Sequence, residues 1–193
     1  MNKRQFLAAA IGSASLPAFS VSASTSRQNV GPSLLTVTGA VVPNRGPFDP
    51  ALDQMMHKQR IKFDRAHAFD FAMLAALPSV AIKPTLEQDA KPHALRGPLL
   101  LDVVKAAGAK LTDATSLLLR AVDGYAVVIT SADMHKYRFI VATHLDGLAM
   151  PLGGLGPLWA MYEADHFPDM AAKALNERFG SCPWALYHIE VQS

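Results

Sequence analysis

The residues best suited to metal binding or acid–base chemistry are seven histidines, at positions 57, 67, 93, 135, 144, 166 and 188. A protein metal site needs several donors at set spacings, and none of these histidines belongs to an HExxH or similar pair. Asp133 with His135, and His144 with Asp146, would each turn two donors to one side if their segments are extended. A metal site would therefore depend on distant segments coming together, and ordinary turn and surface roles are favoured.

Nucleophilic chemistry would have to come from Cys182, the one cysteine. A catalytic cysteine needs a base within hydrogen-bond reach, but His188 lies six residues further on (188 − 182), too far to touch within one extended segment. The chain also lacks the GxSxG elbow of serine hydrolases. Gly153-Gly154-Leu155-Gly156 has the glycines of a phosphate cradle, but no Lys-Ser/Thr helix follows. We interpret Cys182 as a semi-buried inert thiol and the glycines as a turn.

The first residues have the order of a cleavable export signal. Lys3 and Arg4 are basic, Phe6 to Val21 is mainly apolar, and Val21-Ser22-Ala23 offers small residues to signal peptidase. The apolar run is short and interrupted by serines and a proline, whereas a transmembrane helix needs about 20 predominantly apolar residues. We expect residues 1–23 to be removed and the mature protein to work in the periplasm.

Charge and composition narrow the class of the mature protein. The net charge of +2 falls to zero when the two basic residues of the signal are subtracted (2 − 2 = 0). Without a basic stripe, the electrostatic attraction that dominates nucleic-acid binding is missing. One cysteine excludes an intramolecular disulfide framework. We expect a flexible leader over 24–33 and one folded domain over 34–193.

The hydrophobic pattern predicts a mixture of strands and short helices. Strands are predicted at 34–42, 79–83, 116–122, 125–130, 138–143, 158–162 and 184–191. Helices are predicted at 49–62, 69–78, 99–107 and 167–179, with Asp70 capping the second and Gly108 ending the third. Asp146-Gly147 is a tight-turn signal. Without regular βαβ alternation, this pattern indicates an α+β fold with mixed β-sheets.

Phrases spread along the chain resemble, in order and spacing, the oxidoreductase molybdopterin-binding domain, the sulfite-oxidase-type fold, in its short stand-alone version. They are Leu35-Thr36-Val37-Thr38-Gly39, the short helix Phe71 to Pro78, Arg96 to Val104 with Ala107-Gly108-Ala109, Asp123-Gly124-Tyr125, Asp146-Gly147, Gly156-Pro157-Leu158-Trp159 and Trp184 to Val191. The resemblance covers essentially the whole mature domain, and it implies that fold.

One residue of the family pattern is missing. In the family's enzymes a cysteine thiolate holds molybdenum, in the loop after the strand that precedes the Gly-Pro-Leu helix. Here that stretch reads Val80-Ala81-Ile82-Lys83-Pro84-Thr85, without cysteine, and Cys182 lies in the C-terminal segment. Soft thiolate ligation cannot come from Lys83, Pro84 or Thr85. The departure argues against molybdenum catalysis.

The resemblance extends to short exported proteins that bind a reduced pterin without molybdenum and inform a membrane-bound regulator of cyclic diguanylate turnover. A pterin is a flat polar heterocycle that needs an apolar or aromatic slot with a few fixed donors and acceptors. The candidate pterin-binding residues by phrase position are Thr85, Asp123, Tyr125, Trp159, Tyr162 and Trp184. Each also has a simpler interpretation, as core for the tryptophans and as a hairpin turn for Asp123.

Three functions follow from these observations. The leading hypothesis is a non-catalytic exported pterin-binding protein that relays pterin occupancy to a membrane-bound regulatory protein. The first alternative is a molybdopterin-dependent oxidoreductase, supported by Lys3-Arg4-Gln5-Phe6-Leu7, which resembles a twin-arginine signal. The second alternative is a structural or interaction domain with a vestigial pocket.

Overall fold

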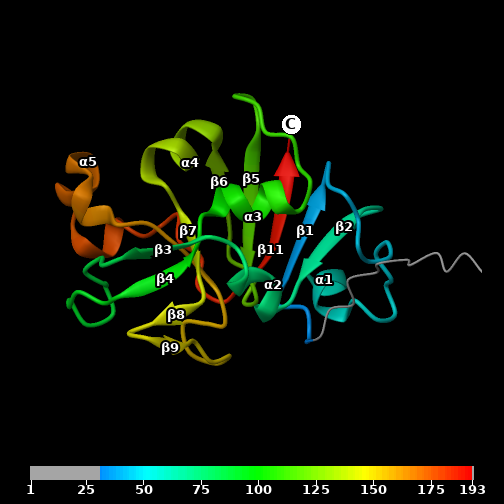
Figure 1. Ribbon diagram of the computed structural model, residues 1–193, viewed down its shortest axis with the longest axis horizontal. Coiled ribbons are helices and arrows are strands. Elements are labelled where there is room, and N and C mark those ends of the chain that lie inside the picture. Colours follow the sequence, from blue (N-terminus) through cyan, green and yellow to red (C-terminus); the bar gives the residue numbers. More distant parts are fainter. Residues whose placement is uncertain (1–30, 193) are drawn as a thin grey trace, which may run out of the picture.

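The computed structural model describes residues 31–192 as an α+β protein with three sheets and a few short helices (Figure 1). The predicted signal, most of the predicted leader and the last residue lie outside the described residues. Within residues 31–192, no helix has the length and apolar character needed to cross a membrane.

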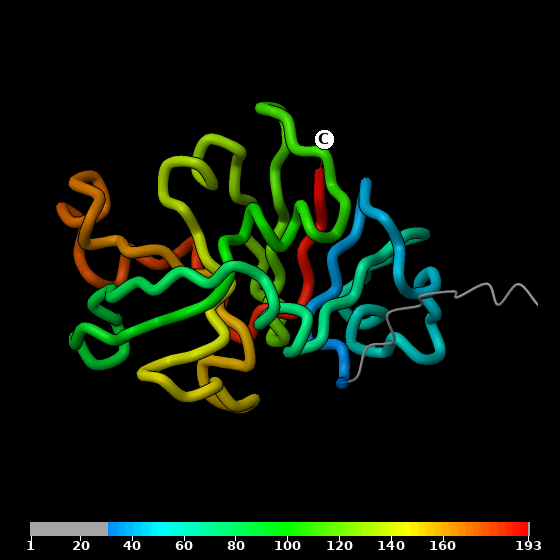
Figure 2. Tube along the Cα trace, viewed as in Figure 1, coloured from blue at the N-terminus to red at the C-terminus, as the bar shows by residue number. Residues whose placement is uncertain are grey.

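A five-stranded sheet forms one side of the molecule. Its strand order is β2 (Ala66–Phe69), β1 (Leu35–Gly39), β11 (Leu186–Gln192), β5 (Ser116–Ala121) and β6 (Ala126–Thr130). The pair β1 and β11 is parallel and the other pairs are antiparallel, so the sheet is mixed. The first and last strands are therefore neighbours, as the blue and red tubes of Figure 2 show.

Two smaller sheets form the other side. One has the order β3 (Ser79–Ile82), β4 (Leu95–Pro98), β8 (His144–Leu145) and β9 (Leu148–Ala149), and the second pairs β10 (Trp159–Met161) with β7 (Ile140–Ala142). Strand β4 passes so close to β7 that a Cβ atom at Gly97 would lie 1.9 Å from the carbonyl oxygen of Val141. Only glycine permits this approach, which brings the two small sheets together.

The helices are short, and some of them begin at side-chain caps. They are α1 (Gln54–Lys58), α2 (Phe71–Ala75), α3 (Leu100–Ala106), α4 (Ser131–Tyr137) and α5 (Pro168–Ala171), with 3₁₀ turns at Ala164–His166 and Leu175–Glu177. The Asp70 carboxylate accepts a hydrogen bond from the Met73 amide at the start of α2. Thr130 and Asp133 form a capping box at the start of α4. Gly108 follows α3 in the left-handed region, at φ 84°.

Several predictions from the sequence are confirmed. Helix α2 with its Asp70 cap, helix α3 with Gly108, and the strands β3, β5 and β6 lie where the pattern predicted them. The Asp146-Gly147 turn joins β8 to β9, with both residues at positive φ. The fold is mixed α+β, as expected.

Other predictions are wrong in extent or missed an element. The helix predicted over 49–62 is reduced to Gln54–Lys58, because the preceding residues form turns and Arg60 adopts a left-handed conformation. The surface helix predicted over 167–179 is broken into α5 and a 3₁₀ turn by an extended residue at Ala174. Strand β4 was missed because Gly97-Pro98 resembles a breaker, and α4 was missed although its capping box is present in the sequence.

A buried polar network crosses the centre of the five-stranded sheet. His188 of β11 is fully buried, with its Nε2 atom 3.0 Å from Thr38 Oγ1 and its Nδ1 atom 3.0 Å from Arg120 Nη1. Since the guanidinium can only donate, Nδ1 accepts and the Nε2 hydrogen is donated to Thr38. Burial, reinforced by the nearby Arg120 charge, lowers the pKa of His188 to about 3. The histidine is therefore neutral in the folded protein, while Arg120 also pairs with Glu190.

Candidate functional site

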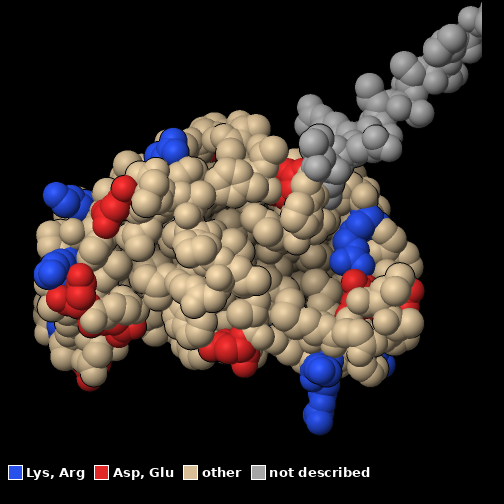
Figure 3. Space-filling model, turned by 90° about the horizontal axis from the view of Figure 1, so that it is seen from below, with Lys and Arg blue, Asp and Glu red and all other residues tan. Residues whose placement is uncertain are grey.

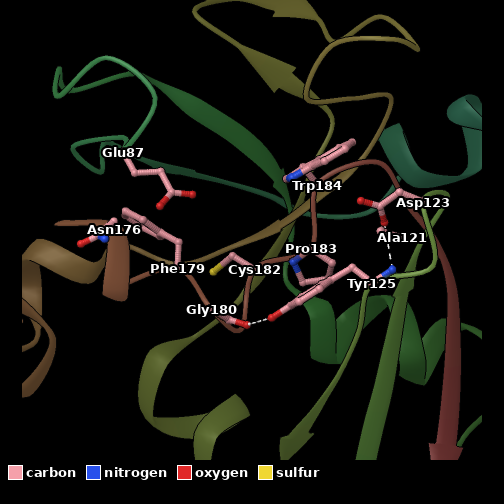
Figure 4. A pocket seen from close by; sticks show the side chains of 10 residues that line it. All are labelled: Glu87, Ala121, Asp123, Tyr125, Asn176, Phe179, Gly180, Cys182, Pro183 and Trp184. Carbon is pink, nitrogen blue, oxygen red and sulfur yellow. Dashed lines mark hydrogen bonds between the residues drawn. The ribbon is translucent and has the colours of Figure 1, made fainter. Parts of the chain in front are cut away.

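A pocket of ≈ 210 Å³ lies where three irregular segments meet (Figure 4). The β3–β4 loop contributes Glu87, the end of β5 and the turn that follows it contribute Ala121, Asp123 and Tyr125, and the segment leading into β11 contributes the rest. The complete lining is Glu87, Ala121, Asp123, Tyr125, Asn176, Phe179, Gly180, Cys182, Pro183 and Trp184. The volume lies below the roughly 300–1,000 Å³ of pockets for drug-sized ligands, so the pocket suits a small ligand.

The turn between β5 and β6 is tied to the opposite wall of the pocket. One Asp123 carboxylate oxygen accepts a hydrogen bond from the Tyr125 amide at 2.9 Å, and Gly124 between them has φ 95°. The Tyr125 hydroxyl donates to the carbonyl of Gly180 at 2.5 Å. Because Tyr125 is 47% exposed, its ring faces solvent at the pocket while its hydroxyl is held. The Asp123 side chain thus shapes its own turn and keeps further acceptor capacity.

The segment before β11 supplies one exposed aromatic side chain and one buried thiol. Trp184 is 40% exposed and is followed by Ala185, which has a left-handed φ of 48°. Cys182 is buried, and its carbonyl accepts the indole N–H of Trp159 at 2.9 Å. Burial raises the pKa of the Cys182 thiol, and the Glu87 carboxylate contributes to the rise in pKa. The thiol is neutral and unsuited to attack or metal ligation.

The stretch after β3 is anchored to carboxylates. The Lys83 amide donates to Glu163 Oε1 at 3.1 Å, and the Thr85 amide donates to Asp165 Oδ2 at 2.7 Å. Arg178 pairs with Asp165 at 2.8 Å and thereby balances its charge. This stretch offers backbone donors and no thiolate, so its donor set does not fit molybdenum.

A histidine between two carboxylates fixes the far end of the β3–β4 loop. His93 Nδ1 lies 2.6 Å from Asp146 Oδ2, and His93 Nε2 lies 3.0 Å from Asp89 Oδ2. The second oxygen of Asp146 accepts the Ala94 amide at 2.9 Å. The hydrogen bond to Asp146, followed by that to Asp89, raises the pKa of His93. The loop that bears Glu87 is therefore fastened to the β8–β9 turn.

The pocket includes half of the six residues expected from the sequence. Asp123, Tyr125 and Trp184 line it. Trp159 and Tyr162 do not, because their side chains are 1% and 2% exposed within the core, where the Tyr162 hydroxyl donates to the Arg178 carbonyl. Thr85 lies in the same loop as Glu87 but is absent from the lining.

Seven of the ten lining residues were not among the predicted site residues, and three of these seven, Glu87, Asn176 and Phe179, bear the polar or aromatic side chains that matter most for binding. They lie in a polar loop and in the segment after α5, where no periodic pattern distinguishes a pocket residue from a surface residue. Only the spacing of the family phrases could have drawn attention to the loop after β3. These residues line the pocket only because segments far apart in the sequence come together.

Metal and catalytic arrangements weighed from the sequence find no support among residues 31–192. In that part of the chain, no group of three or more His, Cys, Asp or Glu side chains is placed to hold a metal ion. Asp133 and His135 lie in helix α4, so the extended arrangement that would have aligned them does not occur. His188 is held by Thr38 and Arg120, which leaves it no role as a base for Cys182.

No protein-family model matches the chain, and no curated protein matches it either. We therefore infer the type of ligand that suits the pocket from its lining side chains. Aromatic rings of Tyr125, Phe179 and Trp184 offer faces for a flat molecule, and Glu87 and Asp123 offer carboxylate acceptors. This combination suits a small flat heterocycle with several N–H donors.

Proposed function

We propose that this protein binds a pterin, without molybdenum and without catalysing a reaction. The observation that carries the proposal is the meeting of Asp123, Tyr125 and Trp184 in one pocket (Figure 4). These residues come from two segments about 60 positions apart in the sequence, and they are of the types that a pterin requires.

Each side chain has a role in this proposal. Trp184, with Tyr125 and Phe179, supplies apolar ring surface for the flat heterocycle. Asp123 accepts hydrogen bonds from the 2-amino group and the adjacent ring N–H of the pterin, a bidentate pairing that carboxylates favour. The link from Tyr125 to Gly180 holds the two walls together, so the site is formed before the ligand arrives.

The proposed fold is the sulfite-oxidase type, and its support is the ordered series of phrases together with the mixed sheets and short helices. The molybdopterin-dependent oxidoreductase is the weaker alternative. The stretch after β3 has no thiolate, and Cys182 is a buried neutral thiol. A structural domain with a vestigial pocket is the remaining alternative, and a binding measurement distinguishes it from a pterin-binding protein.

The proposal extends to an exported protein that relays pterin occupancy, in the periplasm, to a membrane-bound regulator of cyclic diguanylate. The resemblance supplies this partner. Exposed apolar side chains support a protein contact, since Leu148 of β9 is 76% exposed and Leu152, in the following loop, is 73% exposed. Figure 3, seen from the side of β8 and β9, shows a broad stretch without charged side chains between charged ends.

The test is calorimetric titration of the purified protein with 6-hydroxymethylpterin, together with elemental analysis for molybdenum. We expect stoichiometric pterin binding without stoichiometric metal. Trp184→Ala should weaken binding by about 3- to 10-fold, the magnitude of one aromatic stacking contact. Leu152→Ala, which removes an exposed side chain outside the pocket, is the control and should leave the affinity unchanged.

Two results would contradict the proposal. Stoichiometric molybdenum in the protein from its native compartment would favour the oxidoreductase. Absence of pterin binding by the correctly folded protein would favour the vestigial pocket. Thermal unfolding of each variant shows whether a loss of affinity reflects the pocket or the fold.

A further inference from the structure

The pocket that we propose for a pterin carries negative charge without a compensating cation. Two of its ten lining residues, Glu87 and Asp123, are carboxylates, and none is Lys, Arg or His. Cys182 adds no charge, because burial raises the pKa of its thiol. Any ligand that enters therefore meets two carboxylates and neutral groups.

Two arginines lie next to lining residues in the sequence, Arg120 before Ala121 and Arg178 before Phe179, and both have other partners. Arg120 bonds to His188 and Glu190. The guanidinium of Arg178 pairs with Asp165 at 2.8 Å and donates to the carbonyls of Lys173 and Ala171 at 3.0 and 2.8 Å. An anionic group in the pocket would have to take Arg178 from these three acceptors. The arginine is thus a structural tie of the segment after α5 and not a free anion-binding group.

The carboxylate of Glu87 stands on a loop whose backbone is fixed on both sides. Thr85 is tied to Asp165 before it, and His93 is tied to Asp89 and Asp146 after it. Within the loop, the Leu86 amide donates to the Lys91 carbonyl at 2.9 Å. These contacts hold the loop backbone on both sides of Glu87, whose side chain lines the pocket.

We infer that this pocket selects by charge: it takes a neutral or positively charged heterocycle and rejects one with a carboxylate or phosphate tail, with Glu87 and Asp123 as the specificity-determining residues. The inference rests on the proposed function, because it names which members of the pterin class bind. Like charges at close range in a partly desolvated site repel strongly. Phosphorylated pterins, molybdopterin among them, are excluded on the same ground.

The experiment compares two probes that share one ring system, 6-hydroxymethylpterin and pterin-6-carboxylate, by calorimetry on the full protein at low salt. We expect the neutral probe to bind about tenfold more tightly. Glu87→Gln should reduce this ratio to about threefold by strengthening the binding of the carboxylate. High salt should also reduce the ratio, because exposed charges are screened.

The matched control is Glu177→Gln, which removes an exposed carboxylate next to Asn176 in the sequence but outside the pocket lining. It should leave the ratio unchanged. Equal affinities, or tighter binding of the carboxylate, would overturn the charge selection while pterin binding itself stands. An unchanged ratio in Glu87→Gln would overturn the role of Glu87. Failure of both probes to bind would overturn the proposed function and this inference with it.

Discussion

The five-stranded sheet and the pocket are built by different means. The central strands β1, β11 and β5 pair along their length, with one register shift between Leu186 and His188, and most of their buried residues are apolar, such as Leu35, Val37, Leu117, Leu119 and Ile189. The pocket is formed by a loop, a turn and an irregular segment. Side-chain bonds to backbone groups hold these pieces, such as Tyr125 to Gly180. The sheet gains its stability from burial, and the pocket gains its shape from a few polar links.

Two histidines show the same difference. His188, in the sheet, is fully buried and neutral, with one partner at each ring nitrogen. His93, in the loop that bears Glu87, is partly exposed and has a carboxylate at each ring nitrogen. Their pKa values are shifted in opposite directions, lowered for His188 and raised for His93. Protonation therefore opposes folding in the sheet and stabilises the loop at the pocket.

The largest loss in the free energy of unfolding is expected from His188→Ala. The substitution leaves a cavity between β1 and β5, removes the partner of the buried Thr38 hydroxyl and removes one of the two partners of Arg120, which keeps Glu190. We expect a loss of about 2–4 kcal/mol in the free energy of unfolding, measured by urea denaturation at pH 7.

The control for this prediction is His135→Ala, which truncates an exposed histidine on α4. Its effect should stay within about 0.5 kcal/mol. A change of similar size in the two variants would mean that the buried network contributes nothing beyond an exposed histidine, and the contrast between the two regions would fail.

The next largest effect is the acid sensitivity of the sheet. The pKa of His188 is about 3 in the fold against an ordinary value of 6.5, so below pH 6.5 the unfolded chain binds a proton that the folded protein does not. Its contribution to stability is present above pH 6.5 and is lost as the pH falls. Between pH 6.5 and 4.5 this amounts to about 2–3 kcal/mol.

The measurement compares unfolding free energies of the wild type and His188→Gln across this pH range. Both proteins retain His93, His144 and all carboxylates, so the difference between their pH slopes isolates His188. Parallel slopes would show that His188 does not titrate between the folded and unfolded states, contrary to its burial.

The sequence predicts four strands of the five-stranded sheet, β1, β11, β5 and β6, because their signals are local, whereas the edge strand β2 was missed. Alternation in 116–122 and 125–130 predicts β5 and β6, and the Asp70 cap predicts α2, since a side chain and its partner three residues on suffice. Strand β4 could not be predicted, because Gly97 is explained only by the carbonyl of Val141 on a strand about 40 residues later.

The candidate site was predicted only in part, because some of its residues have local signals and others do not. Asp123 and Tyr125 belong to a recognisable turn, whereas Glu87 and Asn176 join the pocket through long-range contacts. Trp159 and Tyr162 have the residue types of a ligand pocket, but Trp159 in β10 and Tyr162 directly after it are buried within the core. Residue type alone does not distinguish a ring that contacts a ligand from a ring that fills the interior.

The smallest change in the free energy of unfolding is expected at His93. It tests whether the loop at the pocket has a stability of its own, distinct from that of the sheet. His93→Ala removes the link from the β3–β4 loop to Asp146 but no core side chain, so the free energy of unfolding should fall by less than about 1 kcal/mol. Because its folded pKa is raised, the wild-type contribution is present below pH 6.5 and is lost as the pH rises through the folded pKa. This is the opposite direction to His188.

The sensitive measurement for His93 is local. Hydrogen exchange at the Leu86 and Ala90 amides, which bond within the loop, should accelerate several-fold in His93→Ala while the amides of β11 stay protected. The control, His135→Ala, removes an exposed side chain on α4 that lies outside this loop, and it should leave both sets unchanged. Acceleration in β11 as well would mean that the loop and the sheet open together, and the pocket would then share the stability of the core.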